Sequence, residues 1–271
     1  MQKIKTPAEN HIFTVDDACA KLCERNKIIF HRLVAKLLFL SKRAQPDIQL
    51  TIAFLTTRVQ NPEDGHLKKL RRVLNYLDII IHSVKLYLKV NDLNAVHWWV
   101  DTSYGTHPDL KGETGPTISI RKGCVTSAQK KQKVNTTSSK IRKVVGVHEV
   151  SPQVLWTRAF LQEKGFEVNK ATLYQDSMSA MLLKKRAHVK LKPNKTHHDQ
   201  LLFIQYRIDK GGIGLEYCHT DKMVANFMTK TIQGGKFFKF RDHIMGRSKS
   251  ENIDGGRKVR DEIAQKEGFG V

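Results

Sequence analysis

Long apolar runs, paired cysteines and acidic residues are all scarce in this chain of 271 residues. No segment approaches the roughly 18 consecutive apolar residues that a membrane-spanning helix needs. The first residues, MQKIKTPAENHIF, contain no hydrophobic secretory core. The four cysteines are too few and too scattered for a disulfide scaffold. We therefore expect an intracellular protein, cytoplasmic or nuclear, that is neither secreted nor membrane-bound.

The shortage of acidic residues leaves a large positive charge. Lys and Arg number 47 and Asp and Glu only 26, which gives a net charge of +21. Such an excess predicts a polyanionic partner, most simply nucleic acid, although a basic surface without a ligand has the same composition. Apolar residues make up 40% of the chain, enough for a folded core.

The chain divides into two blocks and a tail. Apolar residues at helical spacing run from about 27 to 78, so residues 1–82 are interpreted as a small helical segment. The basic residues Lys68, Lys69, Arg71 and Arg72 share one stretch of this block, either as a solvated face or as a phosphate track. Residues 247–271 are charged and non-periodic, and we expect a flexible tail.

Residues 83–246 have the pattern of a mixed α/β sheet with flanking helices. Strand character appears at 84–88, 96–100, 117–120, 124–127, 171–174 and 213–218, and helical character at 138–164, 178–183, 199–208, 223–228 and 237–244. Pro152 lies inside the longest helix and should kink or divide it. Trp98 and Trp99 should face opposite sides of their strand. Core packing is the favoured interpretation of Trp156, Tyr217 and Phe227.

Two carboxylates follow predicted strands directly. Asp101 comes after the apolar run 96–100, and Asp176 comes after 173–175. Two such acids could converge at one edge of the sheet and hold Mg²⁺, which prefers oxygen ligands. Two acids are too few for a pair of metal ions, however, and an Asp after a strand is more often a turn or helix cap.

A family resemblance adds to this interpretation. Residues 98–104, WWVDTSY, resemble the W-x-V-D-A-S-Y motif of the ribonuclease H domain in copia-type retrotransposon polyproteins. Residues 131–139 resemble K-Q-K-x-x-T-x-S-S, 174–180 resemble Y-x-D-N-x-S-A, and 223–230 resemble M-x-A-D-x-x-T-K. The helical block resembles the segment that joins reverse transcriptase to ribonuclease H in this family. The similarity covers about residues 5 to 245.

The resemblance implies a ribonuclease H-like mixed sheet and metal-dependent hydrolysis of RNA in RNA–DNA hybrids. The family uses four acids, of which Asp101 and Asp176 are retained here as the metal ligands. Lys143 stands at the position of the second acid and Asn226 at that of the fourth. If it points into the site, an ammonium at position 143 would pair with Asp101 and Asp176 and repel a divalent cation; if it turns to solvent, a weak site for one metal ion would remain. We therefore expect a degenerate active site, with Mg²⁺ or Mn²⁺ bound only if activity remains.

Three hypotheses follow for the function of the chain. The first is a retroelement ribonuclease H-like domain whose catalysis is weak or lost. The second is a nucleic-acid-binding module that holds a hybrid or duplex without cutting it. The third is a decayed fragment without a selected function. Candidate nucleic-acid contacts, which the alternative assigns to solvated loops, are Lys131, Lys133, Lys184, Lys185 and Arg186.

Overall fold

The computed structural model describes residues 4–14, 18–89, 95–103, 112–119, 123–132, 139–181 and 195–248. The N-terminal helices are α1 (Glu24–Arg43), η1 (Pro46–Ile48), α2 (Gln49–Thr56) and α3 (Asp64–Ile80). The strands are β1 (Ala95–Ser103), β2 (Glu113–Ser119), β3 (Thr126–Ser127), β4 (Lys130–Lys131), β5 (Lys170–Gln175) and β6 (Gly214–Tyr217). The remaining helices are α4 (Ser139–Glu163), α5 (Met178–Met181), α6 (Lys195–Asp209), α7 (Asn226–Thr229) and α8 (Gly234–Ile244).

The strands form one mixed sheet in the order β3-β2-β1-β5-β6, with β4 paired to β2. β1 and β2 are antiparallel, as are β2 and β3, whereas β5 is parallel to both β1 and β6. α4 provides the long crossover from the antiparallel part to β5, as a parallel pair requires. The predicted fold class, a mixed sheet with flanking helices behind a helical segment, is confirmed.

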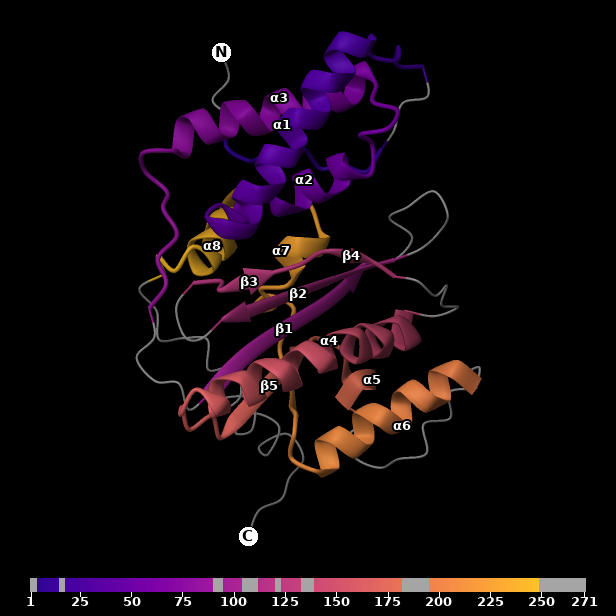
Figure 1. The fold of residues 1–271 in the computed structure, drawn as a ribbon, viewed down its shortest axis with the longest axis vertical. Coiled ribbons are helices and arrows are strands. Elements are labelled where there is room, and N and C mark those ends of the chain that lie inside the picture. The colour runs from indigo at the N-terminus through magenta and orange to yellow at the C-terminus, as the bar shows by residue number, and fades with distance from the viewer. Residues whose placement is uncertain are drawn as a thin grey trace.

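Helices cover both faces of the sheet (Figure 1). α4 and α6 lie on one face, and a core of valine, leucine and isoleucine side chains fills the space beneath them. α7, α8 and the N-terminal helices lie on the other face and share a second core with it. Trp98 belongs to the first core and Trp99 to the second, which confirms that the two side chains face opposite sides. The N-terminal helices are therefore packed into the same core as α8.

Two predicted features are wrong in detail. Residues 84–88 form no strand; the Tyr87 N–H donates instead to the Met245 carbonyl at 2.9 Å, beyond the end of α8. Pro152 also does not divide its helix, because α4 continues through it as one element; the predicted kink stays a prediction. A proline inside a helix costs about 3 kcal/mol. Buried Val147 and Val154 anchor α4 to the sheet on either side of Pro152, and this packing offsets the cost.

Trp156 contradicts its predicted place in the core, because its side chain is 65% exposed on the outer surface of α4. Phe227 is buried as predicted. The difference arises because α4 buries only the side that faces the sheet, and Trp156 lies on the opposite side of the helix from buried Val154.

The basic stretch of α3 is divided between solvent and packing. Lys68 and Arg71 are exposed. The Lys69 ammonium donates to the Thr14 carbonyl at 2.5 Å, and Arg72 forms an ion pair with Glu9 at 2.8 Å. Two of the four cations therefore fix the N-terminal segment, which leaves a smaller charged face than the sequence suggested.

Candidate functional site

The register of the parallel strands brings the two predicted acids level with each other. Trp99 in β1 pairs with Tyr174 in β5. Continuing this register by two residues places Asp101 opposite Asp176 at the carboxyl end of β5. The carboxyl ends of parallel strands meet at one edge of a sheet, which is where α/β proteins commonly bind ligands. The convergence anticipated from the sequence is present, since both carboxylates contact one side chain, that of Lys143.

Asp101 is completely buried, and cations surround it. Its Oδ2 accepts a hydrogen bond from the Thr229 hydroxyl at 2.5 Å and lies 3.2 Å from the Lys230 ammonium. Its Oδ1 lies 3.8 Å from the Lys143 ammonium. An ionised carboxylate without partners would be costly to bury, so these contacts explain how Asp101 is tolerated.

Asp176 shares the same ammonium. Its Oδ1 accepts a hydrogen bond from Lys143, and its Oδ2 accepts one from the Thr220 hydroxyl at 3.1 Å. Lys143 is 21% exposed and lies in α4, which packs on the opposite face of the sheet from α7. The predicted ion pair between Lys143 and the retained carboxylates is confirmed.

Close backbone contacts hold the helices that carry these partners. At Gly146, one turn after Lys143, a Cβ atom would overlap the Thr102 side chain in β1. At Gly115, the partner of Asp101 in β2, a Cβ atom would lie 2.8 Å from Cβ of Met228 in α7. Because glycine has no side chain, both helices approach the sheet closely and reach the carboxylates.

Asn226 and Lys230 form the second half of the site. Asn226 is buried, and its Nδ2 donates to the Thr220 carbonyl at 2.9 Å. Its Oδ1 accepts from the Lys230 ammonium at 2.5 Å, so Lys230 bridges Asn226 and Asp101. Sequence reasoning did not single out Lys230. Its position four residues after Asn226, one helical turn away, is the signal that could have identified it.

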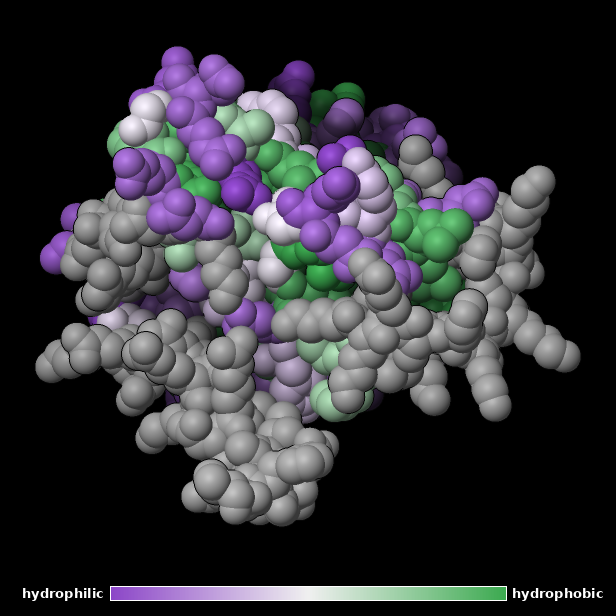
Figure 2. All heavy atoms as spheres, turned by 90° about the horizontal axis from the view of Figure 1, so that it is seen from below, coloured by the Kyte–Doolittle hydropathy of each residue, from purple (hydrophilic) through white to green (hydrophobic). Residues whose placement is uncertain are grey.

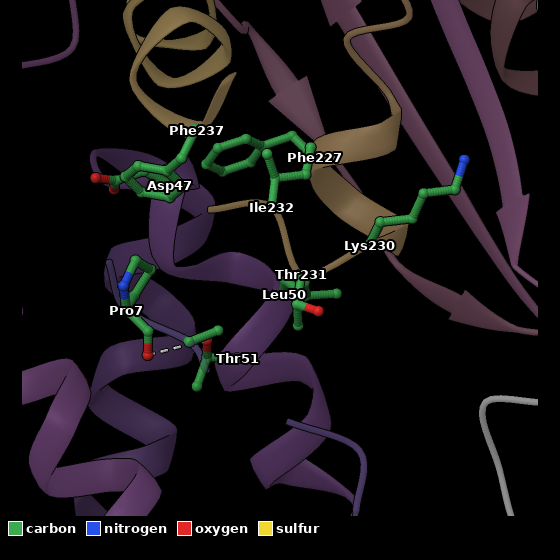
Figure 3. A pocket seen from close by; sticks show the side chains of 10 residues that line it. Pro7, Asp47, Leu50, Thr51, Phe227, Lys230, Thr231, Ile232 and Phe237 are labelled. Atoms are coloured by element: carbon green, nitrogen blue, oxygen red, sulfur yellow. Dashed lines mark hydrogen bonds between the residues drawn. The ribbon is translucent and has the colours of Figure 1, made fainter. Parts of the chain in front are cut away.

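A pocket lies beside this part of the chain, between the N-terminal helices and α7. Pro7, Leu50, Phe227 and Phe237 line it, together with the backbone around Lys230 (Figure 3). The Lys230 side chain extends away from the pocket and toward the strands, in agreement with its contact to Asp101. The carboxylate cluster therefore does not open into this pocket.

The arrangement does not fit a pair of divalent cations. Lys143 contacts both acids, and the amide of Asn226 carries no charge. Within the described part of the chain, no group of three or more His, Cys, Asp or Glu side chains could hold a metal ion. The resemblance implies such ions, but the donor set at this site is composed largely of ammonium–carboxylate pairs.

The other predicted contacts are less fully described. Lys133, Lys184, Lys185 and Arg186 lie outside the described residues, as do residues 249–271 of the predicted tail. Lys131 belongs to β4, where its backbone pairs with Glu113 of β2. Among the described helices, none is long and apolar enough to span a bilayer.

Comparison with known proteins identifies relatives among transposon polyproteins. The chain is 21% identical over 240 residues to the retrovirus-related Pol polyprotein from transposon TNT 1-94 of Nicotiana tabacum, covering 86% of the chain and 18% of the relative. It is 23% identical to that from transposon RE1 of Arabidopsis thaliana, covering 74% and 14%. It is 31% identical to a putative transposon Ty5-1 protein of Saccharomyces cerevisiae, covering 38% and 34%. No family model matches the chain.

A solved foamy viral protease-reverse transcriptase in complex with an RNA/DNA hybrid covers 81% of the chain and 27% of its own length, with 12% identity and a TM-score of 0.44. The resemblance stated from the motifs is confirmed by the sequence relatives, because the homologues are retrovirus-related Pol polyproteins. The chain spans less than a fifth of the length of the plant polyproteins that it matches.

Proposed function

We propose that this chain, a homologue of retrovirus-related Pol polyproteins, is a ribonuclease H-like module that binds nucleic acid and has weak or no hydrolytic activity. The observation that carries the proposal is the position of Lys143, whose ammonium contacts both Asp101 and Asp176. In the related motifs a carboxylate stands at this position.

The electrostatics of the site support a loss of two-metal hydrolysis. At about 4 Å and an effective dielectric constant near 20, a pair of opposite charges attracts by roughly 4 kcal/mol before desolvation. Lys143 therefore competes with a divalent cation for the carboxylates and also repels it. Lys230 adds a second positive charge 3.2 Å from Asp101, and Asn226 provides an amide in place of an acid.

Binding does not require the missing acids. A chain with a net charge of +21 attracts the phosphate backbone, whose contacts give affinity without catalysis. We assign these contacts to the basic residues Lys131, Lys133, Lys184, Lys185 and Arg186. We also propose that residues 1–82 correspond to the end of a reverse transcriptase, 83–246 to the ribonuclease H-like domain and 247–271 to a tail.

The proposal is tested by cleavage of a labelled RNA–DNA hybrid in Mg²⁺ and in Mn²⁺. The chain itself should cut slowly or not at all. The double variant Lys143→Glu with Asn226→Asp restores both acid positions, and we expect its cleavage rate to exceed that of the parent by at least about a hundredfold, because bound metal ions supply several kcal/mol of transition-state stabilisation. Each single variant serves as a control for the pair.

Efficient cleavage by the unaltered chain would overturn the proposal. Another carboxylate would then have to serve the site, and Glu149 of α4 is the nearest candidate along the chain. Its Oε2 accepts a hydrogen bond from the Thr114 hydroxyl at 2.7 Å, so it is held against β2. Salt-dependent binding of the hybrid, measured without turnover, tests the remaining half of the proposal.

A further inference from the structure

An exposed pair of stacked aromatic rings lies on the outer surface of α4. Trp156 is 65% exposed and Phe160 is 44% exposed. Their ring centroids are 5.2 Å apart and the ring planes differ by 13°, which is a stacked arrangement. The other two tryptophans, Trp98 and Trp99, are 3% and 4% exposed. Exposing the largest aromatic side chain to water forgoes the stabilisation of burial, which indicates a binding role.

Cations accompany these rings. The Lys164 ammonium lies 5.8 Å from the centroid of Phe160, at the end of the stack. One turn of helix separates Trp156 from Phe160, and Lys164 follows directly after the last residue of α4, where its N–H donates to the Phe160 carbonyl. The three side chains therefore follow one another at the carboxyl end of α4. A stripe of two aromatic rings and an ammonium combines stacking with attraction for an anion.

α6 carries a similar combination. Tyr206 is 54% exposed, and the Arg207 guanidinium lies 5.7 Å from its ring centroid and 5.2 Å from that of Phe203. Phe203 packs edge-on against His148 of α4 at 5.5 Å, which joins the two helices. Figure 2 views the molecule from the end at which α6 lies in Figure 1, and it shows apolar residues reaching the surface between hydrophilic ones.

This surface is separate from the carboxylate cluster. Trp156 follows Lys143 by 13 residues of continuous helix, which corresponds to about 20 Å along the axis of α4. A base stacked on Trp156 would therefore not itself contact Asp101 or Asp176.

We propose that Trp156 and Phe160, with Lys164, form a stacking site for the bases of a single-stranded nucleic acid. A base placed on Trp156 would extend the existing stack, and the neighbouring cations would face its phosphates. Such sites are tolerant of sequence, because every base presents a flat ring. The charge of the chain favours this ligand over a second copy, since two chains of +21 repel each other.

The test uses Trp156 fluorescence as the reporter in the parent chain, and anisotropy of a labelled oligonucleotide for the variants at position 156, which lack this reporter. Because Trp98 and Trp99 are buried, quenching of fluorescence by a short oligothymidylate reports on Trp156. We expect saturable quenching by the full chain, and binding about tenfold weaker for Trp156→Ala, since one base–aromatic stack contributes roughly 1–3 kcal/mol. Trp156→Phe should keep most of the affinity, measured by anisotropy of a labelled oligonucleotide. Tyr87→Ala removes a 56% exposed aromatic ring elsewhere and is the matched control.

The same variants are measured with an RNA–DNA hybrid duplex, so that failure of this site is distinct from failure of the proposed function. Loss of oligothymidylate binding in Trp156→Ala with unchanged hybrid binding supports the proposal. Equal oligothymidylate affinity of Trp156→Ala and the parent chain would refute it. Self-association that Trp156→Ala abolishes, without quenching by the oligonucleotide, would refute it as well and assign the stripe to a protein contact.

Discussion

Two buried aspartates in this molecule are accommodated in different ways. Asp101, in the last third of β1, is 0% exposed and contacts the ammonium groups of Lys143 and Lys230 and the hydroxyl of Thr229. Asp47, in η1, is 2% exposed and accepts a hydrogen bond from the Tyr76 hydroxyl at 2.6 Å. Burial raises the pKa of Asp47 to about 6, despite the lowering effects of Tyr76 and the nearby Arg241.

The difference lies in the charges near each carboxylate. Two ammonium groups face Asp101, so its negative charge is balanced by direct ion pairs. The neutral Tyr76 phenol is the main hydrogen-bond donor to Asp47, and burial therefore favours the protonated form of this carboxyl group. The carboxylate at the edge of the sheet therefore takes part in internal ion pairs, whereas the aspartate in the helical block is a titratable core residue.

The largest effect on stability is expected from removing a cation from the Asp101 site. Lys143→Met leaves Asp176 without its ammonium and Asp101 with one of two. Breaking a buried ion pair by deleting one partner typically costs about 3–5 kcal/mol, and we expect this range in the free energy of unfolding from urea denaturation. Lys36→Met, at an exposed position of α1, should change stability little. An equal effect of both variants would contradict the role of Lys143.

Removing the charge of Asp47 is expected to raise the free energy of unfolding, which is the opposite of the effect expected for Lys143→Met. Its pKa in the folded state, about 6, lies above the ordinary value of 3.8, so the stability of the fold falls as pH rises from about 4 to 6 and stays at the lower level above pH 6. Asp47→Asn removes that cost and should raise the free energy of unfolding at pH 7 by about 2–3 kcal/mol. The advantage should shrink as pH falls from 6 to 4. Asp78→Asn, at an exposed position of α3, is the control, and a pH-independent difference at position 47 would contradict the assignment.

A smaller pH effect on stability, opposite in sign to that of Asp47, is expected from His243 in α8. Burial lowers its pKa to about 4, and its ring packs edge-on against Trp99 at 6.0 Å. Because the unfolded chain binds a proton below pH 6.5 and the folded chain does not, stability is lost as pH falls from 6.5 to 4. The loss is about 1.4 kcal/mol at pH 5.5. His243→Phe should abolish it in denaturation series between pH 5 and 7, whereas an unchanged pH slope would rule it out.

The two pH effects offset each other between pH 4 and 6, because protonation of Asp47 stabilises the fold while protonation of unfolded His243 destabilises it. The parent chain should therefore show a shallow pH dependence in this window. Asp47→Asn and His243→Phe should each remove one of the two contributions. The pH dependence of stability that remains should then have the sign of the other contribution.

Much of the fold follows from local patterns. Apolar spacing predicted most of the helices and strands, and the convergence of Asp101 and Asp176 at one edge of the sheet was anticipated. The expected end of the first strand at residue 100 is wrong, because β1 continues through Asp101 to Ser103. The proposal that Lys143 and Asn226 stand at acid positions also comes from the sequence, since each lies within or beside a stretch that resembles a family motif. The strand expected at 84–88 is wrong, and the Tyr87 N–H donates to the Met245 carbonyl after α8 instead of to a neighbouring strand.

What the sequence by itself determined is the order of the elements and the chemical types at the acid positions, because both depend on residues close together in the chain. Tertiary structure alone decided that Lys230 and Thr229 reach Asp101. Thr229 lies 128 residues from Asp101 along the chain. It also decided that Trp156 faces solvent and Trp99 the core. The physical reason is that apolar periodicity shows only which residues share a side of a helix or strand. Whether that side is buried depends on elements that come from distant parts of the chain.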